Sequence, residues 1–138
     1  MPNKPFASAR ITIRNNKTGR TVKSRGKAKI FVDSGASISI IPSRHIPALQ
    51  TTGGFDVARA RIQTANGVRE TTALKDVSLC LDKVCFRGDI VVIEDVPGDI
   101  LIGTDFLQSA KCKIDFSKKT LECGGRKLSF SLDEKHGS

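Results

Sequence analysis

Tryptophan and tyrosine are absent from this chain, and only seven of its 138 residues are phenylalanine. A hydrophobic core must therefore rest on Ile, Leu, Val and those few Phe. No apolar run reaches the roughly 20 residues of a transmembrane helix, and the N-terminus lacks the apolar segment of a secretory signal peptide. We therefore expect a soluble, cytoplasmic protein that contacts no membrane. Residues 1–138 are enough for one domain with one core.

The cysteines show no metal-binding spacing. Cys80, Cys85, Cys112 and Cys123 form no Cys-x-x-Cys pair, and the chain has only two histidines. We therefore expect no metal and no other cofactor. Two predicted turns would place Cys80 opposite Cys85, and Cys112 opposite Cys123. Because disulfides are rare in the cytosol, we expect all four side chains to be reduced.

Acidic residues are absent from residues 1–29, which carry nine lysines and arginines. The other residues carry 14 basic and 14 acidic groups, so the formal net charge of +9 belongs to this segment. Such a segment can contact nucleic acid or another acidic partner. It can also be a solvated sheet edge, where Lys blocks aggregation. We favour the edge, because aromatic residues are not interleaved with these cations as base stacking requires.

The segment Ile30–Ile41 places an acid between two apolar runs. Both runs are rich in Ile and Val, which predicts buried strands. Asp33 lies between them, and a buried carboxylate is costly unless it is hydrogen-bonded or used in function. Ser34 supplies a hydroxyl, and Gly35 lets the backbone turn sharply. We interpret the segment as an acid presented on a rigid, strained turn.

Residues 33–36, Asp-Ser-Gly-Ala, resemble the active-site signature of aspartic proteases, Asp-Thr/Ser-Gly-Ala. Downstream, Leu101-Ile102-Gly103 resembles the apolar-apolar-Gly segment that leads into a short helix in retroviral-type proteases. The spacing of the two motifs is also similar to that family. The resemblance runs from about residue 9 to residue 130 and implies an all-β, closed, barrel-like retropepsin fold with one short helix. It implies that Asp33 is catalytic, that Ser34, Gly35 and Ala36 form the active-site loop, and that Leu101, Ile102 and Gly103 support it.

Between the two motifs, the sequence predicts a β-hairpin. Ala58, Ala60 and Ile62 alternate with polar residues, which indicates a strand. Asn66-Gly67 is a strong hairpin signal, because both residues tolerate positive φ. In the resembled family a hairpin at this place is the flap that closes over the substrate, which makes Asn66-Gly67 its tip. The flap and substrate-binding residues implied are Thr64, Ala65, Asn66, Gly67 and Val68.

Weaker signals complete the expected fold. Alternating or apolar runs predict strands at residues 10–14, 77–81, 84–86, 90–93 and 128–132, and a hairpin within 111–123. Thr104 is predicted to cap the short helix, with Asp105 in its first turn. We expect residues 1–7 and 133–138 to be flexible ends.

The chain contains one Asp-Ser-Gly and no second copy, and neither Asp99 nor Asp105 has the turn. Aspartic proteases activate water with two carboxylates that share a proton. The resemblance therefore implies a homodimer in which each chain supplies its Asp33. The implied function is an aspartic endopeptidase, most like that of an LTR retrotransposon or retrovirus, that cleaves a Gag-Pol-type polyprotein. Its place would be the cytoplasm or virus-like particles.

Other functions stay open at this point. Cellular proteins, including ubiquitin-shuttle proteins and a skin protease, also contain such a domain. The domain could be a catalytically idle dimerisation module, although the intact motif at Asp33 argues against that. It could also be a module that contacts RNA through residues 1–29. Serine-hydrolase and P-loop signatures are missing, so these two classes are excluded.

Overall fold

The computed structural model describes residues 4–50, 53–64, 67–94 and 99–133. In this part of the chain no helix is long and apolar enough to span a membrane. The elements, in chain order, are β1 (Lys4–Asn15), β2 (Thr21–Val32), β3 (Ile40–Pro42), the 3-10 turns η1 (Ser43–His45) and η2 (Pro47–Gln50), β4 (Val57–Thr64), β5 (Gly67–Leu81), β6 (Val84–Ile93), β7 (Ile100–Ile102), α1 (Thr104–Ser109), β8 (Lys113–Asp115), β9 (Thr120–Cys123), β10 (Arg126–Ser129) and β11 (Ser131–Asp133).

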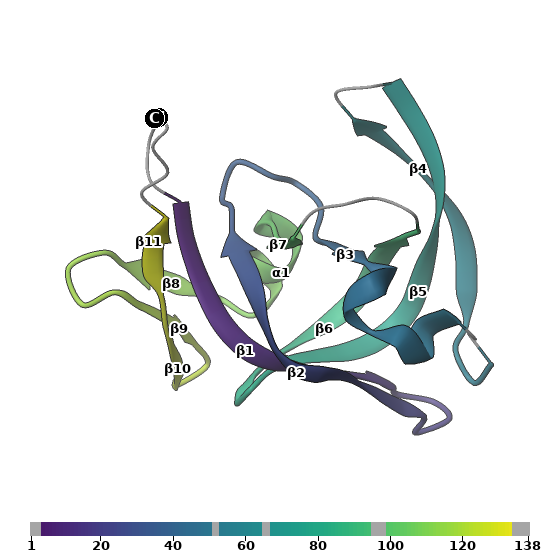
Figure 1. Cartoon of the computed structure of the whole chain (residues 1–138). Helices are drawn as coiled ribbons and strands as arrows, with labels where there is room; N and C mark the ends of the chain where they lie inside the picture. Colours follow the sequence, from purple (N-terminus) through teal and green to yellow (C-terminus); the bar gives the residue numbers. More distant parts are fainter. Residues whose placement is uncertain (1–3, 51–52, 65–66, 95–98, 134–138) are drawn as a thin grey trace.

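Six strands close into a barrel (Figure 1). Their order is β1-β2-β7-β3-β6-β5, and β5 pairs with β1 to complete the ring. The core lies inside it because side chains alternate along each strand. In β1, for example, Ala7, Ala9, Ile11 and Ile13 are buried while their neighbours face outward. The predicted closed all-β fold with one short helix is confirmed.

The first and last described segments of the chain pair with each other. β1 begins at Lys4, and Ala7 is buried. The terminal strand β11 pairs with this end of β1, with Lys4 opposite Asp133. Residues 4–6 and 131–133 therefore lie in paired strands, in which each strand supplies the other with backbone partners. The flexibility of the ends stays a prediction. Residues 1–3 and 134–138 lie outside the described part.

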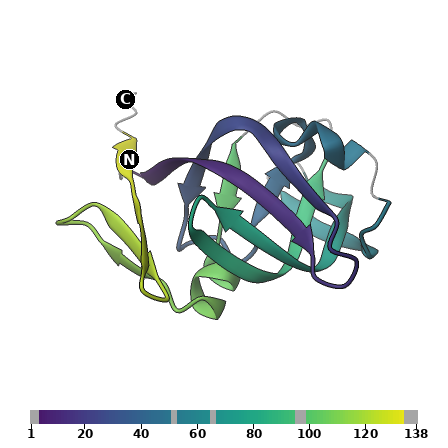
Figure 2. The same cartoon turned by 90° about the horizontal axis from the view of Figure 1, so that it is seen from below.

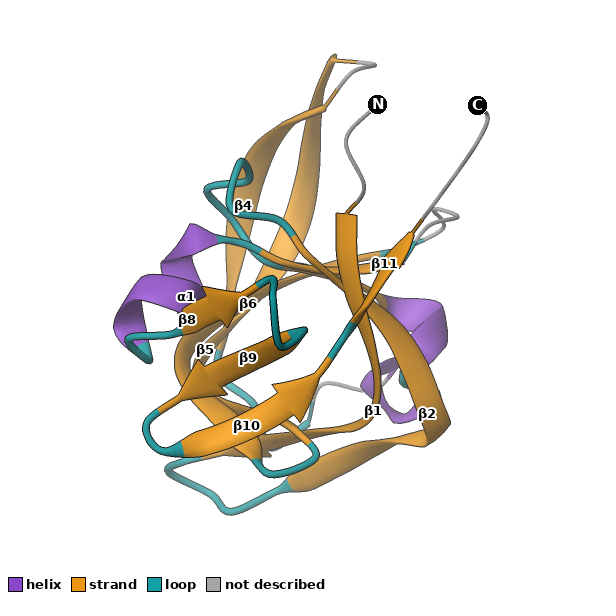
Figure 3. Cartoon of the chain, turned by 90° about the vertical axis from the view of Figure 1, so that its left-hand side faces the viewer, coloured by secondary structure: helices purple, strands orange, loops and turns teal. Residues whose placement is uncertain are grey.

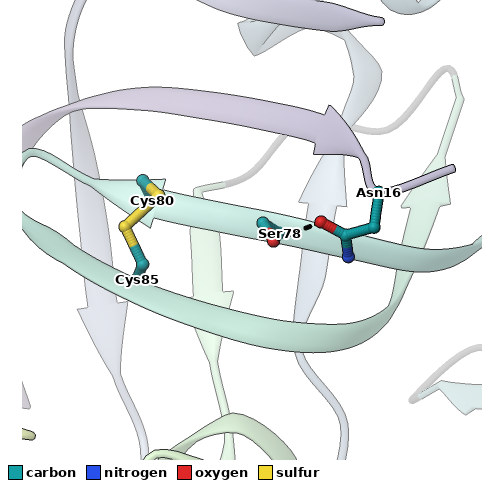
Figure 4. Close-up of a disulfide and its surroundings, with 4 residues drawn as sticks. All are labelled: Asn16, Ser78, Cys80 and Cys85. Atoms are coloured by element: carbon teal, nitrogen blue, oxygen red, sulfur yellow. Dashed lines mark hydrogen bonds between the residues drawn. A yellow bond between two sulfur atoms is a disulfide. The ribbon is translucent and has the colours of Figure 1, made fainter. Parts of the chain in front are cut away.

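The β5–β6 hairpin closes the barrel against β1. Cys80 lies directly opposite Cys85 in this hairpin, with Cα atoms 4.0 Å apart, and the two form a disulfide (Figure 4). On the same strand, the Ser78 hydroxyl donates to Asn16 Oδ1 at 2.7 Å, just beyond β1. The expectation of reduced cysteines is wrong here, because the predicted turn brings the two sulfur atoms within bonding distance.

A small second sheet packs beside the barrel (Figure 3). It has the order β10-β9-β8, and it contains the hairpin predicted within residues 111–123. Cys112 and Cys123 form a second disulfide, so these cysteines too are oxidised. The strand predicted at residues 128–132 is divided in two. Leu128 belongs to β10, Leu132 belongs to β11, and the buried Phe130 lies between them.

Candidate active site

Asp33 follows the last residue of β2, where three strands meet. β7 lies between β2 and β3, parallel to β2 and antiparallel to β3. The Asp33 N–H donates to the Ile102 carbonyl oxygen at 2.9 Å, which extends this pairing by one residue. The chain then leaves the sheet and returns only at Ile40. Of the two predicted flanking strands, the second is therefore shorter than expected.

The Asp33 carboxylate is held within its own loop. Gly35 N–H donates to Asp33 Oδ1 at 2.9 Å, and Ala36 N–H donates to the Asp33 carbonyl oxygen at 3.1 Å. A Cβ atom on Gly35 would lie 3.2 Å from Oδ1, so glycine allows this close approach. Ser34 is exposed, and within the described residues its hydroxyl makes no hydrogen bond to the carboxylate. Gly35 is thus the residue that orients the acid within the chain.

Lys4 is a neighbour of Asp33 that the sequence did not indicate. Its Nζ lies 3.6 Å from Asp33 Oδ2 and 6.0 Å from the centre of the Phe31 ring. The Asp33 side chain remains 27% exposed, and that of Lys4 is 54% exposed. Such an exposed ion pair contributes little to stability. Because its side chain is partly exposed, the Asp33 carboxylate stays accessible to water and to a ligand. Only the pairing of β1 with β2 brings these two residues together.

The second predicted motif supports the loop that carries Asp33. Gly103 N–H donates to Ser39 Oγ at 2.8 Å, and Thr104 N–H donates to the Ala36 carbonyl oxygen at 2.8 Å. A Cβ atom on Gly103 would lie only 2.5 Å from that same carbonyl oxygen. The two segments are 64 or more residues apart in sequence, and only glycine allows their backbones to come this close.

Asp105 and Ser39 form a buried polar link that the sequence analysis missed. Ser39 is fully buried; its hydroxyl donates to Asp105 Oδ1 at 2.6 Å, and its N–H donates to Oδ2 at 3.0 Å. Phe106 N–H also donates to Asp105 Oδ1. The N-cap of α1 is Gly103 rather than the predicted Thr104, and it makes no side-chain capping bond. The sequence signal for this link is Ser39 itself, a polar residue between Ile38 and Ile40. A hydroxyl in such an apolar stretch needs a buried hydrogen-bond partner.

The predicted flap is the β4–β5 hairpin. Thr64 pairs with Gly67, which has φ of +111° and begins β5, so Gly67 lies beside the tip rather than at it. Ala65 and Asn66 lie outside the described residues. Val68 is 61% exposed. Of the three apolar residues predicted to alternate along β4, only Ile62 is buried.

Ile62 belongs to a small apolar cluster between the hairpin and the barrel. The cluster also contains Val91 and Ile93, with Ile40 packed against it. Beside it lies a groove of about 370 Å³, which is lined by Thr71, Thr72, Val92, Ile93 and four charged residues, Arg59, Arg69, Glu70 and Glu94. Among the described residues, no group of three or more His, Cys, Asp or Glu could hold a metal ion. The structure thus shows one partly exposed acid, a small buried apolar cluster and a groove beside the β4–β5 hairpin.

A closed six-stranded barrel whose Asp-Ser-Gly loop is joined to an apolar-apolar-Gly strand defines a retropepsin-like aspartic protease domain. The family described as "gag-polyprotein putative aspartyl protease" matches residues 19–109, and this chain belongs to that family. The predicted family is confirmed. Among solved structures, the chain is similar to the retroviral protease-like domain of Ddi1 from Leishmania major, with 20% sequence identity and a TM-score of 0.55. That match covers 95% of this chain and 98% of the other, and it shows the fold.

Proposed function

We propose that this protein is an aspartic endopeptidase whose active site forms between two copies of the chain. The observation that carries the proposal is the Asp33 carboxylate, which Gly35 orients at one oxygen while the side chain stays partly exposed. A second acid is needed for the chemistry. Asp105 is a poor candidate, because Ser39 and Phe106 donate to both of its oxygens. A twofold axis supplies the partner's Asp33 instead.

In the proposed reaction the two carboxylates share one proton and act as a unit. The ionised carboxylate takes a proton from water, and the water oxygen bonds to the scissile carbonyl carbon. The protonated carboxyl gives its proton to the carbonyl oxygen, which leaves a tetrahedral diol. Proton transfer to the amide nitrogen then accompanies cleavage of the C–N bond, and the products are a free carboxyl and a free amine. No covalent enzyme intermediate and no cofactor take part.

Lys4 bears on this mechanism because its Nζ lies 3.6 Å from Asp33 Oδ2. We propose that the Lys4 ammonium group moves away from Asp33 when the partner's Asp33 approaches in the assembled dimer. The high exposure of Lys4 allows this movement at little cost. The start of β1 pairs with β11, and Lys4 at this start lies beside Asp33. We propose that these paired ends contribute to the dimer interface.

For the substrate, we propose an extended segment of a Gag-Pol-type polyprotein, processed in the cytoplasm or in virus-like particles. The description of the matched family supports this substrate. A cleft that encloses an extended peptide favours apolar side chains next to the scissile bond. A cellular role is the second candidate, because the Ddi1 domain has the same fold. Cleavage of a polyprotein from the chain's own genetic element, but not of unrelated cellular proteins, would support the first.

A mixed-dimer titration tests the shared site. Asp33→Asn keeps the side-chain shape but cannot share a proton, so it should abolish turnover without unfolding the domain. When this variant is mixed into wild type at fixed total protein, with chain exchange confirmed, activity should follow the square of the wild-type fraction. The matched control is Asp99→Asn, an acid beside the second motif, which should leave turnover unchanged.

Two outcomes would contradict the proposal. A linear fall of activity with wild-type fraction would mean that each chain holds a complete site. Wild-type protein that cleaves no member of a peptide library between acidic and neutral pH would refute the peptidase itself. A bell-shaped rate profile on the acid side of neutrality is the expected positive result.

A further inference from the structure

The β1–β2 ribbon carries a row of cations on its outward face. β1 buries one set of alternate side chains in the barrel and turns the other set outward. β2 alternates in the same way, although its inward residues 24, 26 and 28 are only half-buried. The ribbon crosses the near face of the molecule in Figure 2. We call its exposed cations the basic face; they are Arg10, Arg14, Lys23, Arg25, Lys27 and Lys29.

The basic face is not arranged for stability. Arg10 lies directly opposite Lys27 in the register, and like charges in that position destabilise a sheet. Residues 1–32 contain no acid. Among the described residues, Asp82 accepts a hydrogen bond from the backbone N–H of Arg10, and Asp99 lines the same groove as Lys27. The described ribbon itself carries cations and no acid, so an anionic partner would be attracted to this surface.

Protection of a sheet edge explains only part of the pattern. Within the described part of the chain, β2 is a sheet edge over residues 21–29, because β7 pairs with it at residues 30–32 and no other described strand pairs with that side. Lysines there would block aggregation, as the sequence analysis expected. β1, however, is an internal strand: Arg14 lies between Thr21 of β2 and Ser78 of β5. An internal strand needs no protection, so its arginines require another explanation.

The spacing of the cations fits a repeating anion. The outward residues of β2 alternate, so they repeat about every 6.7 Å along the strand. This repeat is comparable to the distance between successive phosphates of an extended single strand of nucleic acid. Next to them lies a groove of about 320 Å³, lined by Arg25, Lys27 and Lys29 together with Arg44, His45 and Asp99. The groove gives the phosphate backbone a path along the free edge of β2.

The aromatic residues missed in the sequence pattern are also present. Phe6 and Phe31 are opposite each other in the register, with ring centres 6.0 Å apart. Lys29 Nζ lies 4.4 Å from the centre of the Phe6 ring. Aromatic side chains beside a basic groove are the usual platform for unpaired bases. This pair lies on adjacent strands, and Phe31 lies outside residues 1–29, so only the strand register brings the two rings together.

We propose that the basic face binds single-stranded nucleic acid. Binding is electrostatic along the ribbon and does not depend on sequence. A flexible single strand follows the twist of the two strands, which a stiff duplex does not. None of the six cations is among the residues that contact the Asp33 carboxylate in this structure, and binding does not depend on peptidase activity.

Fluorescence anisotropy with a labelled 20-nucleotide single-stranded RNA tests the proposal over a range of salt concentrations. If the six cations contact phosphates, log Kobs should fall against log salt with a slope of about −4. The triple variant Arg14→Gln, Lys23→Gln, Lys27→Gln should reduce the slope to about −2 and weaken binding about 100-fold at 0.1 M salt. Asp33→Asn should bind as wild type does.

The control variant removes the same number of charges from the small sheet: Lys113→Gln, Lys118→Gln, Lys127→Gln. These three lysines are exposed, and their removal should leave both slope and affinity close to wild type. Equal losses in the two variants, or no salt-dependent binding by wild type, would overturn the proposal. So would a polyglutamate peptide that competes as well as RNA, since the surface would then serve an acidic protein. If the first triple variant does not fold, the single variants should each reduce the slope by about 0.7.

Discussion

Gly103→Ala is the sharpest test of how the site is built. Gly103 has φ of −104° and ψ of −170°, an extended conformation that alanine adopts without strain. The cost is steric: the added Cβ would lie 2.5 Å from the Ala36 carbonyl oxygen and 3.0 Å from that of Ile38. Both are backbone atoms, so no side-chain rotation relieves the contact. The Asp33 loop and β7 must therefore separate.

The magnitude follows from that separation. Overpacking of this kind costs about 2 kcal/mol. Moving the loop also weakens the hydrogen bond from Gly103 N–H to Ser39 Oγ or that from Thr104 N–H to the Ala36 carbonyl oxygen, at about 1 kcal/mol. We expect a loss of about 3 kcal/mol in the free energy of unfolding, which lowers Tm by roughly 10 °C in a chain of this size.

Thermal and urea unfolding measure the effect, and Gly26→Ala is the matched control. A Cβ atom on Gly26, in β2, meets nothing within 4 Å, so that substitution should change stability by less than about 0.5 kcal/mol. Ser39→Ala should cost about 2 kcal/mol, because it removes buried hydrogen bonds to the same region. The two effects should not add in the double variant. A Gly103→Ala protein with wild-type Tm, or full additivity, would refute this account.

Three further predictions concern the hairpins. Gly67→Val places a branched residue at φ of +111°, which strains the backbone, although the added Cβ contacts no other atom. If the hairpin must close over the substrate, kcat/KM for peptide cleavage should fall more than stability does. Equal losses would make the hairpin purely structural. Hydrogen bonds from Lys75 Nζ and the Asp76 backbone lower the pKa of Asp89 below its usual 3.8. The stability that the lowered pKa adds is present above about pH 4 and is lost as the pH falls further. Lys75→Met should therefore make Tm fall less steeply in acid. An unchanged dependence of Tm on pH would show that Lys75 does not stabilise the fold through Asp89. Replacing Cys80 and Cys85 together by Ser should cost about 2 kcal/mol in urea unfolding, given the short loop they close; no loss under oxidising conditions would mean that the bond does not form.

Local patterns in the sequence were sufficient for the class of fold and for the acid-bearing turn on which the candidate site is proposed. Alternation of apolar residues determined which face of β1 enters the core, since one side chain in two faces inward along any strand. Asp33 followed by Ser-Gly indicated an acid on a turn, and Leu101-Ile102-Gly103 indicated its support. Both motifs depend on neighbouring residues alone, so they can be read without knowledge of the rest of the chain.

The tertiary structure decided what lies next to these motifs. Lys4 reaches Asp33 only because β1 pairs with β2, and Ser39 reaches Asp105 across 66 residues only because β7 inserts between β2 and β3. The gathering of Arg10 and Lys27 into one charged face likewise depends on strand register. Composition and periodicity describe single strands, whereas these contacts depend on which strands become neighbours when the barrel closes. The pairing of strands is determined by the whole chain, because every strand must find its partners and bury its apolar face at the same time.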